Sequence, residues 1–371
     1  MNYDLIIIGA SFAGLSCARA AVSAGLNVAV IEKKSSSGAK LHTTGVIVKD
    51  AIEANPWLQT IPSELTRVVE GVRLYAPKLN YIDLYAPGYY FWATETPALL
   101  DWMANDLAKM GVTLWHQTVF ESAMRESDGW IIKTKSGQNE LIFKTAYLVG
   151  ADGPHSRVAK ALGLSANTQF LFGQEHEYAQ ASLSPDVLHC FIDRKLARGY
   201  LGWALAGVNL NQIGLARRYH PQNPDARRLD FDAFLHKISP HIQIDSTQPD
   251  AVRAGMIPCG GVLPRISTSR AILVGDAAGM VSPVTAGGIH TALQHGEAVG
   301  LKVAEFLNHR STHAIDPANE LIANYPNYRL KRFLRWGYDH FQRDWMFDLM
   351  LHSKALKRFA EQIYFHKRGT N

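Results

Sequence analysis

A glycine-rich turn between two short apolar runs near the N-terminus constrains the fold of this chain most strongly. Residues 4–8 form an apolar run, GASFAG follows at 9–14, and residues 27–31 form a second apolar run. Short runs of this kind are typical of strands buried on both faces of a parallel sheet. Alanines recur between the runs and give a helix there a small face that lies close on the sheet. The sequence therefore predicts a strand–turn–helix–strand unit and an α/β fold.

The residues of this turn suit a bound dinucleotide. Gly9 permits the tight turn and Gly14 permits close helix–strand packing, while Ser11 replaces the middle glycine of G-x-G-x-x-G. Free N–H groups and the dipole at the start of the helix favour a pyrophosphate. Glu32 lies 23 residues after Gly9, where its carboxylate accepts hydrogen bonds from ribose hydroxyls and disfavours a 2′-phosphate. We predict dinucleotide binding; a purely structural unit is the alternative.

Two later apolar runs end in the same manner. Segment 147–157 reads YLVGADGPHSR and segment 271–279 reads AILVGDAAG, so each run ends in glycine and a single aspartate. The carboxyl ends of parallel strands meet at one edge of a sheet, where α/β folds bind ligands. Asp276 is expected to accept hydrogen bonds from a polyol such as a ribityl chain. Gly287 and Gly288 are expected to let the next helix direct its N-terminal amides at a flavin pyrimidine ring.

GASFAG with Glu32, GADG at 150–153 and GDAAG at 275–279 together resemble the FAD-binding signatures of the p-hydroxybenzoate hydroxylase-like flavoprotein superfamily. The resemblance implies a Rossmann-like FAD-binding domain of the glutathione-reductase type, an inserted β-rich substrate domain, C-terminal helices and FAD as cofactor. The expected parts are an FAD domain of 1–60, 95–165 and 265–310, a substrate domain of 61–94 and 166–264, and a helical region of 311–371.

The resemblance also assigns site residues. The residues expected to bind FAD are Gly9, Ser11, Ala13, Gly14, Glu32, Lys33, Lys40, Thr44, Gly45, Val119, Asp152, Gly153, Gly275, Asp276, Pro283, Gly287, Gly288 and Ile289. The residues expected to contact substrate are the aromatic residues Tyr90, Trp92, Tyr200 and Trp203. The expected catalytic residues are His42, Thr44 and His290. Neither EHEY at 175–178 nor HPQNPD at 220–225 has metal-ligand spacing, so no metal site is expected.

Local patterns favour the geranylgeranyl reductase branch of the superfamily. GAKLHTTGVI at 38–47 resembles its flavin loop, and ARGYLGWAL at 197–205 resembles its Tyr-Gly-Trp substrate motif. The resemblance implies hydride transfer from reduced flavin to a carbon–carbon double bond of a large apolar or lipid substrate. No second nucleotide fingerprint occurs, so NAD(P)H is expected only as a transient electron donor. An NAD(P)H-driven, aromatic hydroxylase-like monooxygenase and a non-catalytic flavin-binding redox sensor stay open as alternatives.

The positive charge of the chain is concentrated at its C-terminus. The formal net charge is +5, of which residues 329–371 contribute +6 and the remainder −1. This distribution argues against a broad nucleic-acid surface. Apolar residues recur at helical spacing in 328–350, so a basic amphipathic helix is expected to lie on a membrane, close a lipid tunnel or pack on the body. The sequence carries no signal for oligomeric state.

The compartment is expected to be the cytoplasm, with peripheral membrane contact as an addition. Three scattered cysteines do not form a disulfide framework. The N-terminal segment lacks the basic and apolar regions of a signal peptide, and the chain has no apolar run long enough to span a bilayer.

Overall fold

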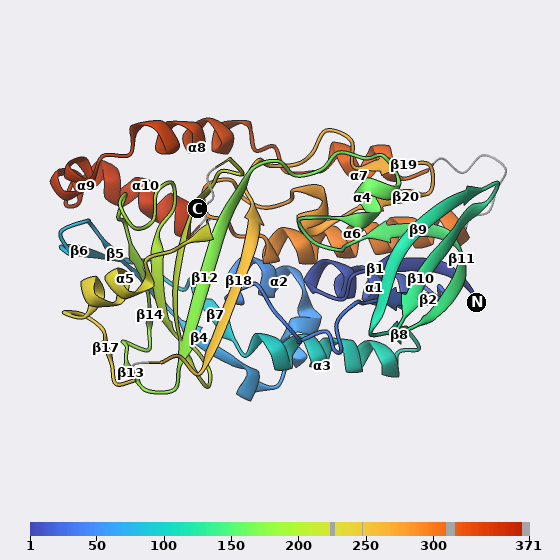
Figure 1. Ribbon diagram of the computed structural model, residues 1–371, viewed down its shortest axis with the longest axis horizontal. Coiled ribbons are helices and arrows are strands. Elements are labelled where there is room, and N and C mark those ends of the chain that lie inside the picture. The colour runs from blue at the N-terminus through green and yellow to red at the C-terminus, as the bar shows by residue number, and fades with distance from the viewer. Residues whose placement is uncertain (223–226, 247, 309–315, 366–371) are drawn as a thin grey trace.

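The computed structural model describes residues 1–222, 227–246, 248–308 and 316–365. Its two lobes lie side by side along the longest axis of the molecule, and the C-terminal helices lie over the second lobe (Figure 1). Parts of the predicted segments 166–264, 265–310 and 311–371 fall outside the described residues. The predicted α/β fold, with a Rossmann-like unit, a β-rich part and C-terminal helices, is confirmed.

The first lobe contains an eight-stranded sheet with a parallel centre in the order β20-β11-β1-β2-β8. Strands β9 and β10 extend it as an antiparallel meander next to β11, and β19 pairs antiparallel with β20 at the edge. Three strands of the parallel centre carry the predicted motifs at their carboxyl ends: β1 leads into the glycine-rich turn, β11 into Asp152 and β20 into Asp276. These three strands are neighbours in the sheet. The strands are β1 (Asn2–Ile8), β2 (Val28–Ile31), β8 (Thr113–Trp115), β9 (Thr118–Glu126), β10 (Gly129–Ser136), β11 (Asn139–Gly150), β19 (Ser267–Thr268) and β20 (Ala271–Leu273).

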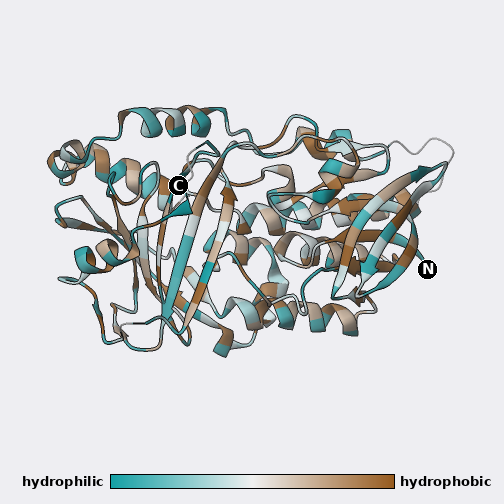
Figure 2. Cartoon of the chain, in the orientation of Figure 1, coloured by the Kyte–Doolittle hydropathy of each residue, from teal (hydrophilic) through white to brown (hydrophobic). Residues whose placement is uncertain are grey.

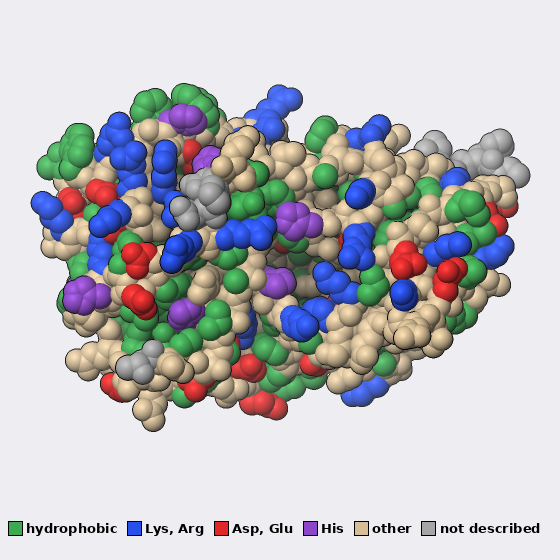
Figure 3. Space-filling view, viewed as in Figure 1, with side chains coloured by type: hydrophobic (Ala, Val, Ile, Leu, Met, Phe, Trp, Pro, Cys, Tyr) green, Lys and Arg blue, Asp and Glu red, His purple; other side chains and the backbone are tan. Residues whose placement is uncertain are grey.

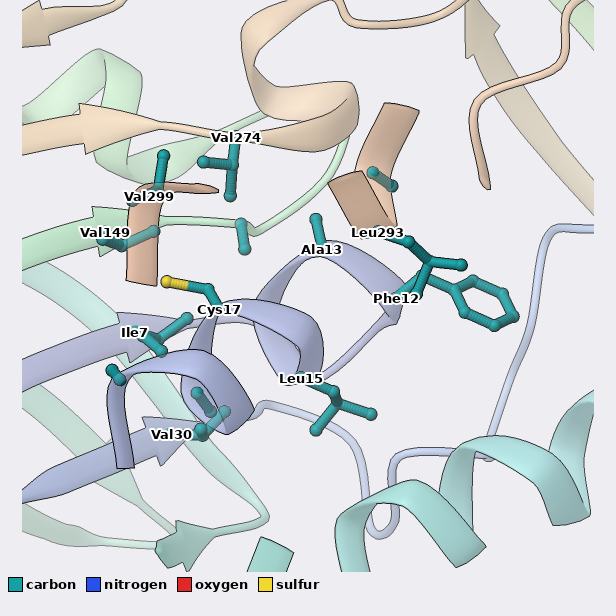
Figure 4. Close-up of a cluster of buried hydrophobic side chains, with 14 of the residues drawn as sticks. Ile7, Phe12, Ala13, Leu15, Cys17, Val30, Val149, Val274, Leu293 and Val299 are labelled. Carbon is teal, nitrogen blue, oxygen red and sulfur yellow. The ribbon is translucent and has the colours of Figure 1, made fainter. Parts of the chain in front are cut away.

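Helices α1 (Phe12–Ser23) and α6 (Ile289–Asn308) pack against each other on one face of this sheet. Two glycines of α6 permit the close approach, since a Cβ on Gly296 would lie 2.3 Å from the carbonyl oxygen of Ala13. A Cβ on Gly300 would lie 2.4 Å from that of Cys17. The core between sheet and helices is built mainly from apolar side chains (Figure 4). Its labelled side chains are Ile7, Phe12, Ala13, Leu15, Cys17, Val30, Val149, Val274, Leu293 and Val299.

The second lobe is built on a seven-stranded sheet in the order β18-β12-β16-β15-β14-β5-β6. All neighbours are antiparallel except β14 and β5. The strands are β5 (Gly71–Tyr75), β6 (Tyr81–Tyr85), β12 (Phe170–Tyr178), β14 (Val187–Phe191), β15 (Gly202–Ala206), β16 (Asn211–Tyr219) and β18 (Ala251–Pro258). Helix α5 (Phe231–Ile238) packs on this sheet through Phe231, Phe234 and Ile238.

Two smaller sheets and several short helices complete the fold. A three-stranded sheet joins β3 (Val46–Val48), β7 (Phe91–Thr94) and β4 (Thr66–Val69), and a two-stranded sheet joins β13 (Ala181–Ser182) and β17 (Gln243–Ile244). The short helices are α2 (Lys49–Ala54), α4 (Arg157–Ala161), α7 (Ala318–Ala323), η1 (Pro56–Thr60), η2 (Ser63–Leu65) and η4 (Gly275–Ala278). The long helix α3 (Thr96–Lys109) begins directly after β7.

The structure differs from the sequence interpretation in the C-terminal region. In place of one amphipathic helix over 328–350, the chain forms α8 (Arg329–Phe341) and α9 (Asp344–Met350), followed by α10 (Lys354–Tyr364). The backbone leaves the helical conformation at Gln342 and Arg343. Gln342 is buried there and its Oε1 accepts a hydrogen bond from Gly199 N at 3.0 Å. Hydrophilic and hydrophobic residues alternate along these helices (Figure 2).

Candidate functional site

A cavity of about 1480 Å³ lies between the two lobes. Its wall contains the ends of the parallel strands, the loop 40–45, strands β12 and β18, the start of α6 and the C-terminal helices. A space-filling view shows a hollow near the middle of one face, with Lys and Arg side chains beside it (Figure 3). Pockets for small molecules measure roughly 300–1,000 Å³. This cavity is therefore large enough for a dinucleotide together with a second molecule.

The turn after β1 leaves an open cradle for a phosphate group. Gly9 has φ +110°, and a Cβ on it would lie 2.3 Å from the carbonyl oxygen of Ala151. A Cβ on Gly14 would lie 2.0 Å from the carbonyl oxygen of Gly9. Ser11 is the N-cap of α1, but its side chain makes no capping hydrogen bond. The first N–H groups of α1 lack intrahelical acceptors and face a turn with no bulky side chain, which suits a pyrophosphate.

Glu32 lies at the end of β2, on the wall of the cavity. Its Oε2 accepts a hydrogen bond from Ala10 N at 2.8 Å and its Oε1 accepts one from Lys34 N at 2.9 Å. The carboxylate therefore fixes the glycine-rich turn. Two carboxylate oxygens offer about four acceptor positions. Two positions remain for the ribose hydroxyls that the sequence predicts.

Asp152 organises the loop after β11. Its Oδ1 accepts a hydrogen bond from Ser156 Oγ at 2.5 Å, and its Oδ2 accepts one from Arg157 N at 2.6 Å. Burial raises the pKa of Asp152, and these hydrogen bonds oppose that shift. Ser156 in turn caps α4 by accepting a hydrogen bond from Ala159 N. Asp152 thus shapes the cavity wall through its neighbours, while Gly153, with φ +84°, forms part of that wall.

Asp276 lies on the cavity wall beside the start of α6. Within the described ranges its carboxylate makes no hydrogen bond or ion pair, and burial alone raises its pKa to about 6. A Cβ on Gly288 would lie 3.4 Å from its Oδ1. A carboxylate oxygen and the N-terminal end of a 20-residue helix are thus next to each other at the cavity. This pair can bind a hydroxyl group and stabilise negative charge.

A stability measurement checks the environment of Asp276. The carboxylate has a raised pKa in the folded protein, so its contribution to stability falls as pH rises from about 4 to 6. We expect cofactor-free Asp276→Asn to be more stable than the parent by about 3 kcal/mol at pH 8. The difference should vanish below about pH 3, where the parent carboxylate is protonated in both states. Urea unfolding at both pH values tests this; an equal difference at both would contradict it.

The loop 40–45 connects the two lobes. Lys40 has φ +47° and Gly45 has φ +79°, and a Cβ on Gly45 would lie 1.8 Å from Thr96 Oγ1. His42 Nδ1 lies 2.5 Å from the carbonyl oxygen of Ala254 on β18. Backbone bends and contacts with β18 therefore fix this loop against the sheet of the second lobe.

Glu175 on β12 is a functional candidate that the sequence interpretation missed. Its side chain is on the cavity wall and only 4% of the residue is exposed. Oε2 accepts hydrogen bonds from Thr44 Oγ1 at 2.6 Å and from Trp203 Nε1 at 2.9 Å. Oε1 is buried without a partner among the described residues. Burial raises the pKa of Glu175 and favours the neutral acid, against the two hydrogen bonds.

Most of the predicted site residues lie on the cavity wall. They are Gly9, Ser11, Ala13, Glu32, Lys33, Lys40, His42, Thr44, Gly45, Val119, Asp152, Gly153, Tyr200, Trp203, Gly275, Asp276, Gly287, Gly288, Ile289 and His290. Gly14 and Pro283 are not on the wall but adjoin it in sequence. Among the described residues no group of three His, Cys, Asp or Glu side chains could hold a metal ion. The segment HPQNPD at 220–225, for which the sequence predicts no metal site, lies partly outside the described residues.

Tyr90 and Trp92 do not reach the cavity. Both side chains pack against the core of the first lobe, and Lys49 Nζ lies 5.5 Å from the ring centre of Tyr90. Successive side chains of a strand point to opposite faces. Phe91, between them on β7, lies on the cavity wall instead. The aromatic run therefore reaches the cavity through Phe91, and not through its two neighbours Tyr90 and Trp92 that the sequence predicts as substrate contacts.

Residues 2–321 match the model of a protein family described as FAD binding domain. This chain belongs to that family. The cofactor is FAD, and the protein is an FAD-dependent oxidoreductase. The geometry fits this cofactor, because the glycine cradle at Gly9, the uncommitted hydroxyl of Ser11 and the start of α6 all lie along one cavity. The predicted FAD binding is confirmed.

Proteins similar to this chain support the resemblance to geranylgeranyl reductases. Digeranylgeranylglycerophospholipid reductase 2 of Methanosphaera stadtmanae is 26% identical over 313 residues, which are 81% of this chain and 78% of the relative. The structure of a geranylgeranyl bacteriochlorophyll reductase-like protein from Thermoplasma acidophilum matches with a TM-score of 0.84 and 18% identity. It covers 99% of this chain and 97% of that one. The resemblance predicted from the motifs is confirmed.

The same fold supports other chemistry. The flavin-dependent brominase Bmp2 matches with a TM-score of 0.72 and 13% identity, over 98% of this chain and 93% of that one. At this identity the likeness shows the fold alone, and the reaction has to be argued from the site.

Proposed function

We propose that this protein reduces carbon–carbon double bonds of an isoprenoid lipid. The relatives named digeranylgeranylglycerophospholipid reductases support this substrate class. The observation that carries the proposal is the apolar continuation of the cavity away from the cofactor motifs. Its wall there is formed by apolar side chains of the second lobe, of β7 and of the C-terminal helices, namely Leu74, Phe91, Leu188, Ile192, Phe347 and Ile363. A wall of this kind binds hydrocarbon chains by removing them from water.

The residues of the first lobe hold FAD in this proposal. The turn at Gly9 and Ser11 binds the pyrophosphate, Glu32 binds the adenosine ribose, and Asp276 with the start of α6 binds the flavin half. Reduced FAD supplies a hydride to the substrate. The protein supplies orientation, exclusion of water and a proton.

Glu175 is the proposed source of that proton. It is the acidic residue on the cavity wall that belongs to the second lobe, whereas Glu32, Asp152 and Asp276 lie at the cofactor motifs. Burial favours the protonated form of this carboxyl, and a protonated carboxyl beside the substrate can donate its proton to a developing carbanion. Thr44 and Trp203 orient the carboxyl through their hydrogen bonds to Oε2. In this proposal Thr44 positions Glu175, whereas the sequence analysis names Thr44 as a catalytic residue.

An anaerobic reoxidation experiment tests the proposal. Chemically reduced holoprotein is mixed, without oxygen, with an archaeal-type phospholipid that carries unsaturated geranylgeranyl chains, and the flavin spectrum is followed. We expect the flavin to be reoxidised by this lipid and to stay reduced with the fully saturated lipid of the same headgroup. Reoxidation only when oxygen and an aromatic substrate are supplied together would contradict the proposal and favour a monooxygenase.

A further inference from the structure

The outer faces of the C-terminal helices expose several large apolar side chains. The side chains of Leu330, Trp336, Trp345 and Leu349 belong to residues that are 50–77% exposed. Hydrophobic and basic side chains gather together on the upper left of the molecule, where α8 and α9 lie (Figures 1 and 3). Large exposed apolar patches with polar surroundings mark sites of protein or membrane contact.

The charge of this face is positive because its acids point elsewhere. Six basic residues of 329–365 are exposed, namely Arg329, Arg332, Arg343, Lys354, Lys357 and Arg358, and none of the four acidic residues is. Asp344 accepts a hydrogen bond from Arg194 N, and Asp348 accepts one from Lys78 N. Asp339 pairs with Arg335 on the inner face of α8. Asp344 and Asp348 therefore fasten the helices to the second lobe, and the exposed charged residues of the outer face are basic.

The exposed face is continuous with the cavity. Phe333, Phe341, Met350 and Phe359 lie on the cavity wall and are also 38–64% exposed. Other side chains of the same helices, including Tyr338 and Phe347, lie deeper on that wall. Tyr338 also fixes α8 by donating a hydrogen bond to the carbonyl oxygen of Tyr200 at 3.0 Å. The exposed apolar face and the apolar part of the cavity wall thus share these four residues.

We propose that the outer faces of α8, α9 and α10 dock on an anionic lipid bilayer. The aromatic and leucine side chains enter the interfacial region, while the exposed lysines and arginines contact the headgroups. Among the described residues no helix is long and apolar enough to cross a membrane. The attachment is thus a surface contact, and Phe333, Phe341, Met350 and Phe359 form the opening through which a lipid enters. This last step, but not the docking itself, rests on the proposed function.

Vesicle co-sedimentation of the holoprotein tests the charge part of the proposal. We expect binding to vesicles of phosphatidylcholine with phosphatidylglycerol, little binding to phosphatidylcholine alone, and release by high salt. Each basic residue at the surface contributes about fivefold in affinity, so Lys354→Ala, Lys357→Ala and Arg358→Ala together should weaken binding about 100-fold. The matched control replaces three exposed lysines of the first lobe, Lys109, Lys135 and Lys160, by alanine and should bind like the parent.

The apolar part is tested with Trp336→Ser and Trp345→Ser, which lie outside the cavity wall. The double variant should lose vesicle binding at least about 10-fold and keep bound FAD, whereas Leu301→Ser, an exposed residue on α6, should change neither. Equal loss of binding in the two triple variants, or no sedimentation of the parent with anionic vesicles, would overturn the proposal. Reduction of a detergent-dispersed substrate should survive in the double variant. Absence of that activity already in the parent would count against the proposed function and leave the docking result valid.

Discussion

Replacing Gly9 by alanine should abolish stable FAD binding. The new Cβ would lie 2.3 Å from the carbonyl oxygen of Ala151, so the turn and the loop after β11 must separate. Separation takes the first N–H groups of α1 away from the pyrophosphate. Losing two hydrogen bonds to a charged group, each about 1.5–3 kcal/mol, weakens binding at least about 100-fold. Flavin fluorescence titration of the cofactor-free protein measures this loss.

Gly25→Ala provides the matched control for Gly9→Ala. Gly25 also has a positive φ, +88°, but a Cβ there would meet nothing within 4 Å. Both substitutions carry backbone strain of about 1 kcal/mol, and only the one at position 9 creates a collision. Gly25→Ala should therefore bind FAD with unchanged affinity. Similar FAD affinity in the two variants, with native far-UV circular dichroism, would contradict the assignment of this turn.

Replacing Glu175 by glutamine should lower turnover by about 10²–10³-fold while FAD affinity stays the same. Glutamine keeps the size of the side chain and an oxygen that accepts from Thr44 and Trp203, but it carries no transferable proton. General acid catalysis contributes roughly 10²–10⁴-fold. Pre-steady-state rates of flavin reoxidation by unsaturated lipid measure the loss.

Glu177→Gln is the matched control for Glu175→Gln. Glu177 lies two residues later on β12, is equally buried and forms an ion pair with Arg253 at 2.5 Å, yet it is not on the cavity wall. Removing one partner of a buried ion pair costs about 3–5 kcal/mol of stability. We expect Glu177→Gln to lower the thermal midpoint and to leave the reoxidation rate within about threefold of the parent. Equal rate losses in both variants would show that Glu175 acts only through the fold.

The cofactor half of the site could be predicted because each of its residues lies in a short local motif at the end of a strand. Gly9, Glu32, Asp152 and Asp276 each stand at the end of a short buried strand, and the parallel sheet brings those ends together. The position of each residue at a strand end was therefore enough to predict that these residues lie close together in space. Their exact contacts were less predictable: Asp152 and Glu32 also hold the backbone of their own loops.

The substrate half depends on long-range packing that local spacing does not encode. Glu175 meets Thr44, 131 residues earlier, only because the loop 40–45 lies against the second sheet. The aromatic run at 89–92 contains two alternating sets, and pairing of β7 with β3 and β4 decides which set faces the cavity. The break between α8 and α9 follows from contacts of Gln342 with Gly199 on the second lobe.

The mass of the lipid product tests the central claim most directly. Reduced holoprotein is incubated with the geranylgeranyl phospholipid under nitrogen and, separately, under air, and the extracted lipid is analysed by mass spectrometry. The account predicts a gain of two hydrogen atoms for each reduced double bond in both atmospheres. A gain of one oxygen atom that occurs only under air would contradict it and identify the protein as a monooxygenase.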